Sequence, residues 1–210
     1  MLDRPTLTGS EPDAGLSRLQ SLVQSFNDYL AMTKPPIVVL LLFTAIGGMF
    51  LAAQAVPPWH IALLVCLGGA LGAGGANALN HYRDQDIAEK MSRTAQRPLP
   101  GNRITPRNAL IFGIVLTVAA FLILGAWVNL LAAFLTLAAT LFYVFVYTMW
   151  LKRTTPQNIV IGGAAGAIPP MVGWVAITGS LDLPALYMFT IIFFWTPPHF
   201  WALALLIKDD

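Results

Sequence analysis

Long apolar segments alternate with short polar connections along this chain. Each apolar segment is close to the ~20 residues that a helix needs to cross a bilayer. The six segments run roughly over 36–54, 59–79, 107–127, 129–149, 157–178 and 184–207. This pattern predicts an all-α fold, a multi-spanning bundle of transmembrane helices.

A weaker pattern precedes the first apolar segment. Over 16–35, apolar residues recur at helical spacing from Leu16 to Leu30. This spacing predicts an amphipathic helix at the membrane interface, although an ordinary packing helix fits it equally well. Residues 1–15 are polar and lack the apolar core of a cleavable signal peptide, so we expect a disordered N-terminus.

The composition supports the membrane interpretation. Charged residues make up 10% of the chain and hydrophobic residues 57%, whereas a soluble domain carries roughly 25% charged residues. A net charge of +2 gives no indication of a nucleic-acid partner. The single cysteine, Cys66, excludes an intrachain disulfide.

The basic residues are confined to alternate connections. The connections near 55–58, 127–129 and 179–183 contain no Lys or Arg, whereas 80–107 holds half of the twelve basic residues. By the positive-inside rule, the N-terminus and the basic connections face the cytoplasm.

One polar group continues from the second apolar segment. On a helix, Asn80 and Asp84 share a face, and Asn77 and His81 form a second ladder with Asp84. Asp86 points roughly 120° away from Asn80 on an ideal helix, so it joins them only where the helix ends or bends. Carboxylate and amide oxygens of this kind are ligands for Mg²⁺.

The basic residues that follow allow two interpretations. Lys90, Arg93 and Arg97 have the chemistry to grip phosphate oxygens, which suits a phosphorylated amphiphile. The alternative is a solvated loop with the salt bridges Asp86–Lys90 and Glu89–Arg93.

A second polar group, "YTMWLKRTTPQN", follows the fourth apolar segment. It holds Tyr147, Lys152, Arg153 and Asn158. Interfacial aromatic residues with flanking Lys and Arg are also ordinary membrane anchors.

A third group, "FFWTPPHFWALALLIKDD", contains an ionisable residue inside an apolar segment. His199 is flanked by Phe194, Trp195, Phe200 and Trp201. Aromatic faces can stabilise a carbocation or stack on a flat, porphyrin-like ligand. The alternative is a hydrogen-bonded histidine at a proline kink.

Proline pairs point weakly to a pocket. Pro169–Pro170 and Pro197–Pro198 are expected to interrupt two of the apolar segments. Backbone groups freed by such breaks must find neighbours or face a cavity.

Taken together, "NHYRDQDIAEKMSRTAQRPLP", "YTMWLKRTTPQNIVIGGAAGAIPPMVGW" and "FFWTPPHFWALALLIKDD" resemble the protoheme IX farnesyltransferases, or heme O synthases. These enzymes belong to the superfamily of intramembrane UbiA-type prenyltransferases. The resemblance covers about residue 27 to the end, and "TPQNIVIGG" and "WTPPHFW" point to the heme enzymes in particular. It implies a transmembrane prenyltransferase domain over 36–210 in the cytoplasmic membrane. It also implies transfer of a farnesyl group from farnesyl diphosphate to the vinyl group of heme b, giving heme O and diphosphate.

The resemblance also implies roles for individual residues. Asn80 and Asp84 would hold Mg²⁺ and the diphosphate, with Asp209 and Asp210 beginning a second acidic metal-binding stretch. The remaining residues that it places around the diphosphate are Arg93, Arg97, Tyr147, Lys152 and Arg153. His199, Trp195, Phe200 and Trp201 would handle the heme or the prenyl cation.

Two departures from the family pattern stand out. The family motif reads Asn-x-x-x-Asp-x-x-x-Asp, but Ala88 occupies its third position, where Asp86 or Glu89 would have to substitute. Family members carry about nine spans, so six spans lead us to expect a fragment or a truncated product.

Two other functions fit parts of the pattern. A related prenyltransferase would use a quinone-precursor or chlorophyll-type acceptor. A transporter is less favoured, because transporter sites lie near the bilayer midplane, whereas these charges gather at one predicted face.

Overall fold

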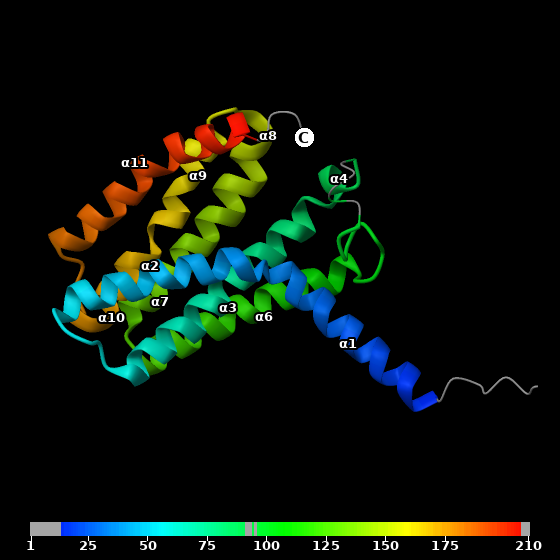
Figure 1. Cartoon of the computed structure of the whole chain (residues 1–210), viewed down its shortest axis with the longest axis horizontal. Coiled ribbons are helices and arrows are strands. Elements are labelled where there is room, and N and C mark those ends of the chain that lie inside the picture. Colours follow the sequence, from blue (N-terminus) through cyan, green and yellow to red (C-terminus); the bar gives the residue numbers. More distant parts are fainter. Residues whose placement is uncertain (1–13, 91–93, 95, 207–210) are drawn as a thin grey trace, which may run out of the picture.

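The computed structural model describes residues 14–90, 94 and 96–206, and these residues form helices and connections with no strand (Figure 1). The all-α prediction is therefore confirmed. In chain order the helices are α1 (Ala14–Thr33), α2 (Pro35–Ala53), α3 (Trp59–Arg83), α4 (Gln85–Ala88), α6 (Pro106–Trp127), α7 (Leu130–Leu141), η1 (Phe142–Leu151), α8 (Lys152–Thr154), α9 (Asn158–Ala167), α10 (Pro169–Thr178) and α11 (Leu183–Leu206).

Six helical segments are long and apolar enough to cross a membrane. They are Pro35–Ala53, Trp59–Arg83, Pro106–Trp127, Leu130–Thr154, Asn158–Thr178 and Leu183–Leu206. Each agrees within a few residues with a predicted span. Large apolar side chains such as Phe43 and Ile191 are about two-thirds exposed, as expected where lipid is the solvent. The protein is an integral membrane protein.

The helices pack in pairs, with α3 against α6, α2 against α10 and α9 against α11. The crossing of α2 and α10 is the tightest, because Gly48 lies on the backbone of Pro170 and Gly173 lies on the backbone of Ala45. A Cβ at either glycine would overlap that backbone. Small residues of this kind allow helix backbones to approach closely.

Helix α1 runs away from the bundle (Figure 1). Its last turns are attached through the Tyr29 and Phe112 rings, whose centroids lie 4.9 Å apart, and through Asp28, which accepts a 3.0 Å hydrogen bond from Arg103 Nε. Leu22 and Phe26 are about two-thirds exposed. Its position at the membrane interface stays a prediction, as does the disorder expected over 1–15, of which residues 1–13 lie outside the described residues.

Prolines act differently in the last two spans. The fifth span changes helix at Pro169, between α9 and α10, as predicted. The expectation of a break at Pro197–Pro198 is wrong, because α11 stays helical through both residues. A proline removes one helical hydrogen bond, but its fixed φ is compatible with a helix.

Candidate active site

The end of α3 places two buried polar side chains on one face. Asn80 is 4% exposed and Asp84 is 5% exposed. Asn80 Nδ2 donates a 2.8 Å hydrogen bond to Asp84 Oδ2, so the two side chains share a face, as the four-residue spacing predicted.

The helix axis changes direction at Asp84, which brings Asp86 to the same site. Asp84 caps α3 with φ −94° and ψ 11°, and the short α4 begins at the next residue. Asp86 accepts two hydrogen bonds from Arg153, of 2.8 and 2.9 Å, and these bonds lower the pKa of its carboxyl to about 2. The solvated-loop alternative required a salt bridge between Asp86 and Lys90. Asp86 instead pairs with Arg153, a cation of α8.

The second polar group meets the first directly. Lys152 Nζ lies 2.5 Å from Asp84 Oδ2, although the two residues are 68 positions apart in the chain. Arg153 Nη2 is 3.9 Å from Asp84 Oδ1. Both cations are thus directed at a buried carboxylate, a contact that the membrane-anchor interpretation does not require.

A stretch of π-helix positions this second group. Over η1, hydrogen bonds connect residues five apart, so residues at that spacing stand above one another. Thr148 Oγ1 donates to the carbonyl of Tyr143 and accepts a 3.1 Å hydrogen bond from Asn80 Nδ2. The backbone N–H of Lys152 donates to the carbonyl of Tyr147 in the same register. Thr148 is fully buried, and the sequence gives no signal for it, because nothing in the chain pattern relates a threonine in this apolar span to Asn80, 68 positions earlier.

The packing of Tyr147 depends on a neighbouring glycine. Its ring lies on Gly162 of α9, where a Cβ would overlap it, and it stacks on the ring of Tyr143 at a centroid distance of 5.2 Å. Tyr147 also lies next to Lys152, because its carbonyl accepts the backbone hydrogen bond of that residue.

Lys34 is a third cation that the sequence reasoning missed. It occupies the junction between α1 and α2 with φ 54°, and its Nζ donates a 3.0 Å hydrogen bond to Asn80 Oδ1. Burial, together with the charges of Arg97 and Lys152, lowers the pKa of Lys34 to about 8. One sequence signal was present, because Lys34 is the only basic residue between Arg18 and Arg83 and directly precedes an apolar span.

The assembled group has an excess of positive charge. We call it the polar cluster: Lys34, Asn80, Asp84, Asp86, Arg97, Thr148, Lys152 and Arg153. Its four cations outnumber its two carboxylates, which suits an anionic ligand. Asp84 Oδ1 is buried and has no hydrogen-bond partner among the described residues, so one carboxylate oxygen is available to a ligand or a cation.

Part of the predicted set cannot be located. Arg93, Asp209 and Asp210 lie outside the described residues. Within the described residues, no group of three His, Cys, Asp or Glu side chains could hold a metal ion. Ala88, at the third motif position, is buried, and its carbonyl accepts a 2.7 Å hydrogen bond from Thr94 Oγ1.

The aromatic group on α11 is a separate feature. His199 stacks on Trp195 at a centroid distance of 4.5 Å and meets Phe200 edge-on at 5.5 Å. Trp195 and Trp201 are each 59% exposed. In the described part of the chain, α11 packs on α9 and α10, and no hydrogen bond or ion pair connects His199 to the polar cluster.

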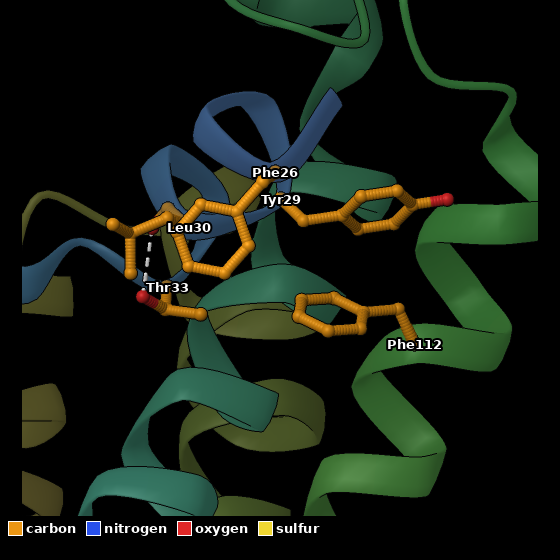
Figure 2. A pocket seen from close by; sticks show the side chains of 5 residues that line it. All are labelled: Phe26, Tyr29, Leu30, Thr33 and Phe112. Atoms are coloured by element: carbon orange, nitrogen blue, oxygen red, sulfur yellow. Dashed lines mark hydrogen bonds between the residues drawn. The ribbon is translucent and has the colours of Figure 1, made fainter. Parts of the chain in front are cut away.

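An apolar hollow of about 360 Å³ lies beside the polar cluster, where α1 meets α6. Figure 2 shows Phe26, Leu30 and Thr33 on one side of it and Tyr29 and Phe112 on the other. It carries no charged lining, so it does not match the chemistry of a diphosphate site.

The sequence profile of the UbiA prenyltransferase family matches residues 41–210, which include most of the polar cluster. The chain belongs to the UbiA prenyltransferase family. The resemblance to intramembrane prenyltransferases is thereby confirmed, and Asn80, Asp84, Lys152 and Arg153 lie within the matched region.

Curated members of the UbiA family resemble the chain more closely. It is 55% identical over 193 residues to the protoheme IX farnesyltransferase of Symbiobacterium thermophilum, covering 92% of this chain and 64% of the relative. It is 55% identical over 183 residues to protoheme IX farnesyltransferase 1 of Saccharopolyspora erythraea, covering 87% and 58%. It is 54% identical over 186 residues to the protoheme IX farnesyltransferase of Thermus thermophilus, covering 89% and 31%. The chain thus spans less than two-thirds of the length of these relatives.

A solved membrane-protein structure shares the fold. It was reported under "Structural and mechanistic insights into the biosynthesis of Digeranylgeranylglyceryl phosphate synthase in membranes". The superposition has a TM-score of 0.72 at 20% sequence identity and covers 81% of this chain and 59% of the other.

Proposed function

We propose that this UbiA-family chain serves in the transfer of a farnesyl group from farnesyl diphosphate to the vinyl group of heme b. Water adds to the vinyl carbon in the same reaction, so the products are heme O and diphosphate. The choice of substrates is supported by the names of relatives about 55% identical to this chain. The placement of the chemistry is supported by the polar cluster.

The observation that carries the proposal is the buried Asp84 carboxylate, which has one oxygen on Lys152 and the other without a hydrogen-bond partner among the described residues. A prenyl diphosphate brings several negative oxygens, which need cations in fixed positions. Lys34, Lys152 and Arg153 converge on the face formed by Asn80 and Asp84 and provide them.

In the reaction, the bond between the farnesyl carbon and the diphosphate oxygen breaks, and its electron pair leaves with the diphosphate. Negative charge therefore grows on the leaving group, and cations already in place stabilise it in the transition state. Lys152 and Arg153 have this role, and Lys34 and Arg97 assist it. The vinyl group attacks the allylic cation, water adds to the resulting cation, and the proton lost by that water balances the reaction.

Mg²⁺ is the cofactor that we propose. When bound, it would offset charge on the leaving diphosphate. Asp84 fits this ion, because its Oδ1 is a buried carboxylate oxygen without a hydrogen-bond partner among the described residues. Asn80 Oδ1 would be the second ligand once the Lys34 ammonium moves to a phosphate oxygen, and Asp209 and Asp210 would add carboxylates. Mg²⁺ commonly uses one or two carboxylates and completes its shell with phosphates and water.

The acceptor side of the proposal involves α11. Trp195, His199, Phe200 and Trp201 offer flat aromatic surfaces, which suit a porphyrin or a prenyl cation. We propose that the polar cluster faces the cytoplasm, and the positive-inside rule applied to the basic connections supports this. The surrounding spans would keep bulk water from the allylic cation.

A pigment assay tests the proposal. Membranes containing the protein are incubated with heme b, farnesyl diphosphate and Mg²⁺, and the extracted pigments are analysed by mass. We expect heme O, which exceeds heme b by one farnesyl group and one hydroxyl group. Farnesylation of a quinone precursor or a chlorophyll-type acceptor, with heme b left unchanged, would refute the heme assignment and leave the prenyltransferase assignment in place.

A further inference from the structure

His81 is a buried polar residue that the proposed mechanism leaves unused. It lies on the last turn of α3, between Asn80 and Asp84, and is 7% exposed. Its Nε2 is buried without a hydrogen-bond partner among the described residues. Burying an imidazole nitrogen without a partner costs free energy, so the position calls for an explanation.

The surroundings of His81 indicate the chemistry of its missing partner. The charged groups that act on it most strongly are the side chains of Lys34, Arg97 and Lys152. All three are cations and none offers a hydrogen-bond acceptor. A neutral imidazole still carries one N–H donor. Asp84, the buried carboxylate of the polar cluster, pairs with Lys152 and makes no hydrogen bond to Nε2, so a further negatively charged acceptor suits this place.

We propose that His81, with its proton on Nε2, donates a hydrogen bond to a phosphate oxygen of the prenyl diphosphate. The proposal rests on the proposed function, because it takes the polar cluster to be the diphosphate site. The His81 imidazole would be a neutral hydrogen-bond donor in a diphosphate site whose other proposed contacts are mostly charged groups. The phosphate oxygen would satisfy Nε2 and the three neighbouring cations together, which no described side chain does.

Two substitutions separate a hydrogen-bond role from a packing role. His81→Gln places an amide N–H close to the position of Nε2, whereas His81→Leu fills similar space without a donor. The probe is inorganic pyrophosphate with Mg²⁺, and its binding to the purified protein is measured by calorimetry. We expect His81→Leu to weaken binding about 10- to 100-fold, the usual loss for a hydrogen bond to a charged group. We expect His81→Gln to remain within about threefold of the unsubstituted protein.

A matched control is available at the other end of the same helix. His60 is an exposed residue on the first turn of α3, and His60→Leu is expected to leave pyrophosphate binding unchanged. Because the chain contains three histidines, ¹⁵N-histidine labelling gives a simple spectrum. Pyrophosphate is expected to shift the His81 resonances and to leave those of His60 in place.

The outcomes distinguish this inference from the function on which it rests. Equal pyrophosphate affinity in the Leu and Gln variants, with unshifted His81 resonances, overturns the His81 assignment alone. A protein that binds no pyrophosphate under any condition overturns the diphosphate site and the His81 assignment with it. Loss of affinity in both variants, with lowered unfolding temperatures and unshifted resonances, assigns His81 to packing and also overturns the inference.

Discussion

The polar cluster and the aromatic group on α11 both lie on predicted spans, yet they are organised differently. The polar cluster joins four separate segments, and its hydrogen bonds connect residues 46 and 68 positions apart. The aromatic group is confined to one helix, and its rings contact neighbours within five positions. The fold fixes the side-chain positions of a site that is built from several segments. The side chains of a group on one exposed helix are fixed only by whatever packs against them. Predictions about the first should therefore be large and specific, and those about the second small.

The largest effect is expected for Asp84→Asn. This change removes the buried carboxylate that pairs with Lys152. We expect prenyl transfer to fall about a hundred- to a thousand-fold, as when a fixed electrostatic group is removed from other active sites. Pigment analysis by mass measures the loss. Asp182→Asn, in the connection before α11, is the control and should retain full activity. Near-normal transfer by Asp84→Asn would remove Asp84 from the mechanism.

The next effect concerns the π-helix. Deleting Phe145, whose side chain is 56% exposed, shortens η1 by one residue and allows α-helical hydrogen bonding. Lys152 would then rotate by roughly 100° relative to α7. We expect pyrophosphate affinity to fall about 100-fold or more, by loss of the Lys152 and Thr148 contacts. Phe145→Ala removes the same side chain without changing the register and should bind normally. Equal binding by the deletion variant would show that the register of η1 is not needed.

A smaller effect is expected from pH. The pKa of Lys34 is lowered to about 8, so its ammonium is present below that pH and is lost above it. Pyrophosphate binding should therefore weaken about 10- to 100-fold as pH rises through 8 toward 10. Lys34→Arg stays charged and corrects for the titration of pyrophosphate itself. A pH profile shared by both proteins would contradict a role for Lys34.

Protein stability responds to pH in the opposite direction. Between about pH 8 and 10.5 the unfolded chain binds the Lys34 proton more tightly than the folded protein does. The contribution of Lys34 to the free energy of unfolding therefore increases as pH rises through this range.

The smallest effect is expected for His199→Ala. His199 is exposed and, among the described residues, makes no hydrogen bond or ion pair with the polar cluster. Pyrophosphate affinity should not change, and the KM for heme b should rise less than about tenfold, as for loss of one aromatic contact. Steady-state kinetics with heme b varied measures this value. A large fall in kcat at saturating heme would show that His199 takes part in the chemistry.

The spans and the shared face of Asn80 and Asp84 could be predicted because both follow from fixed periods. Bilayer thickness sets the length of an apolar helix, and the α-helical turn sets which residues share a side. The sequence predicts that Asp86 joins this site only if the helix ends or bends. It does not predict the bend itself, because the backbone angles at Asp84 depend on packing.

Lys34 and Thr148 could not be predicted by the same reasoning. Lys34 reaches Asn80 from a junction with positive φ, and neither that angle nor the contact across 46 residues is visible in a periodic pattern. Thr148 is held by a hydrogen bond to the carbonyl of Tyr143, five residues earlier, within a π-helix that no periodic pattern in the sequence indicates. Nor does the α-helical period indicate that α11 continues through Pro197 and Pro198.

The crossing of α2 and α10 has a consequence for how sequences of this fold can vary. Gly47 and Gly48 are adjacent in the chain, but a Cβ at Gly47 meets nothing within 4 Å, whereas one at Gly48 overlaps the backbone of Pro170. Alanine at Gly47 would add about 1 kcal/mol of helix propensity at no steric cost. At Gly48 the same change would force α2 and α10 apart. Helix α2 begins beside Lys34, and α10 continues from α9, the helix that Tyr147 contacts. Gly47 can therefore be replaced in related sequences, whereas Gly48 is restricted to glycine by a helix crossing that lies outside the polar cluster.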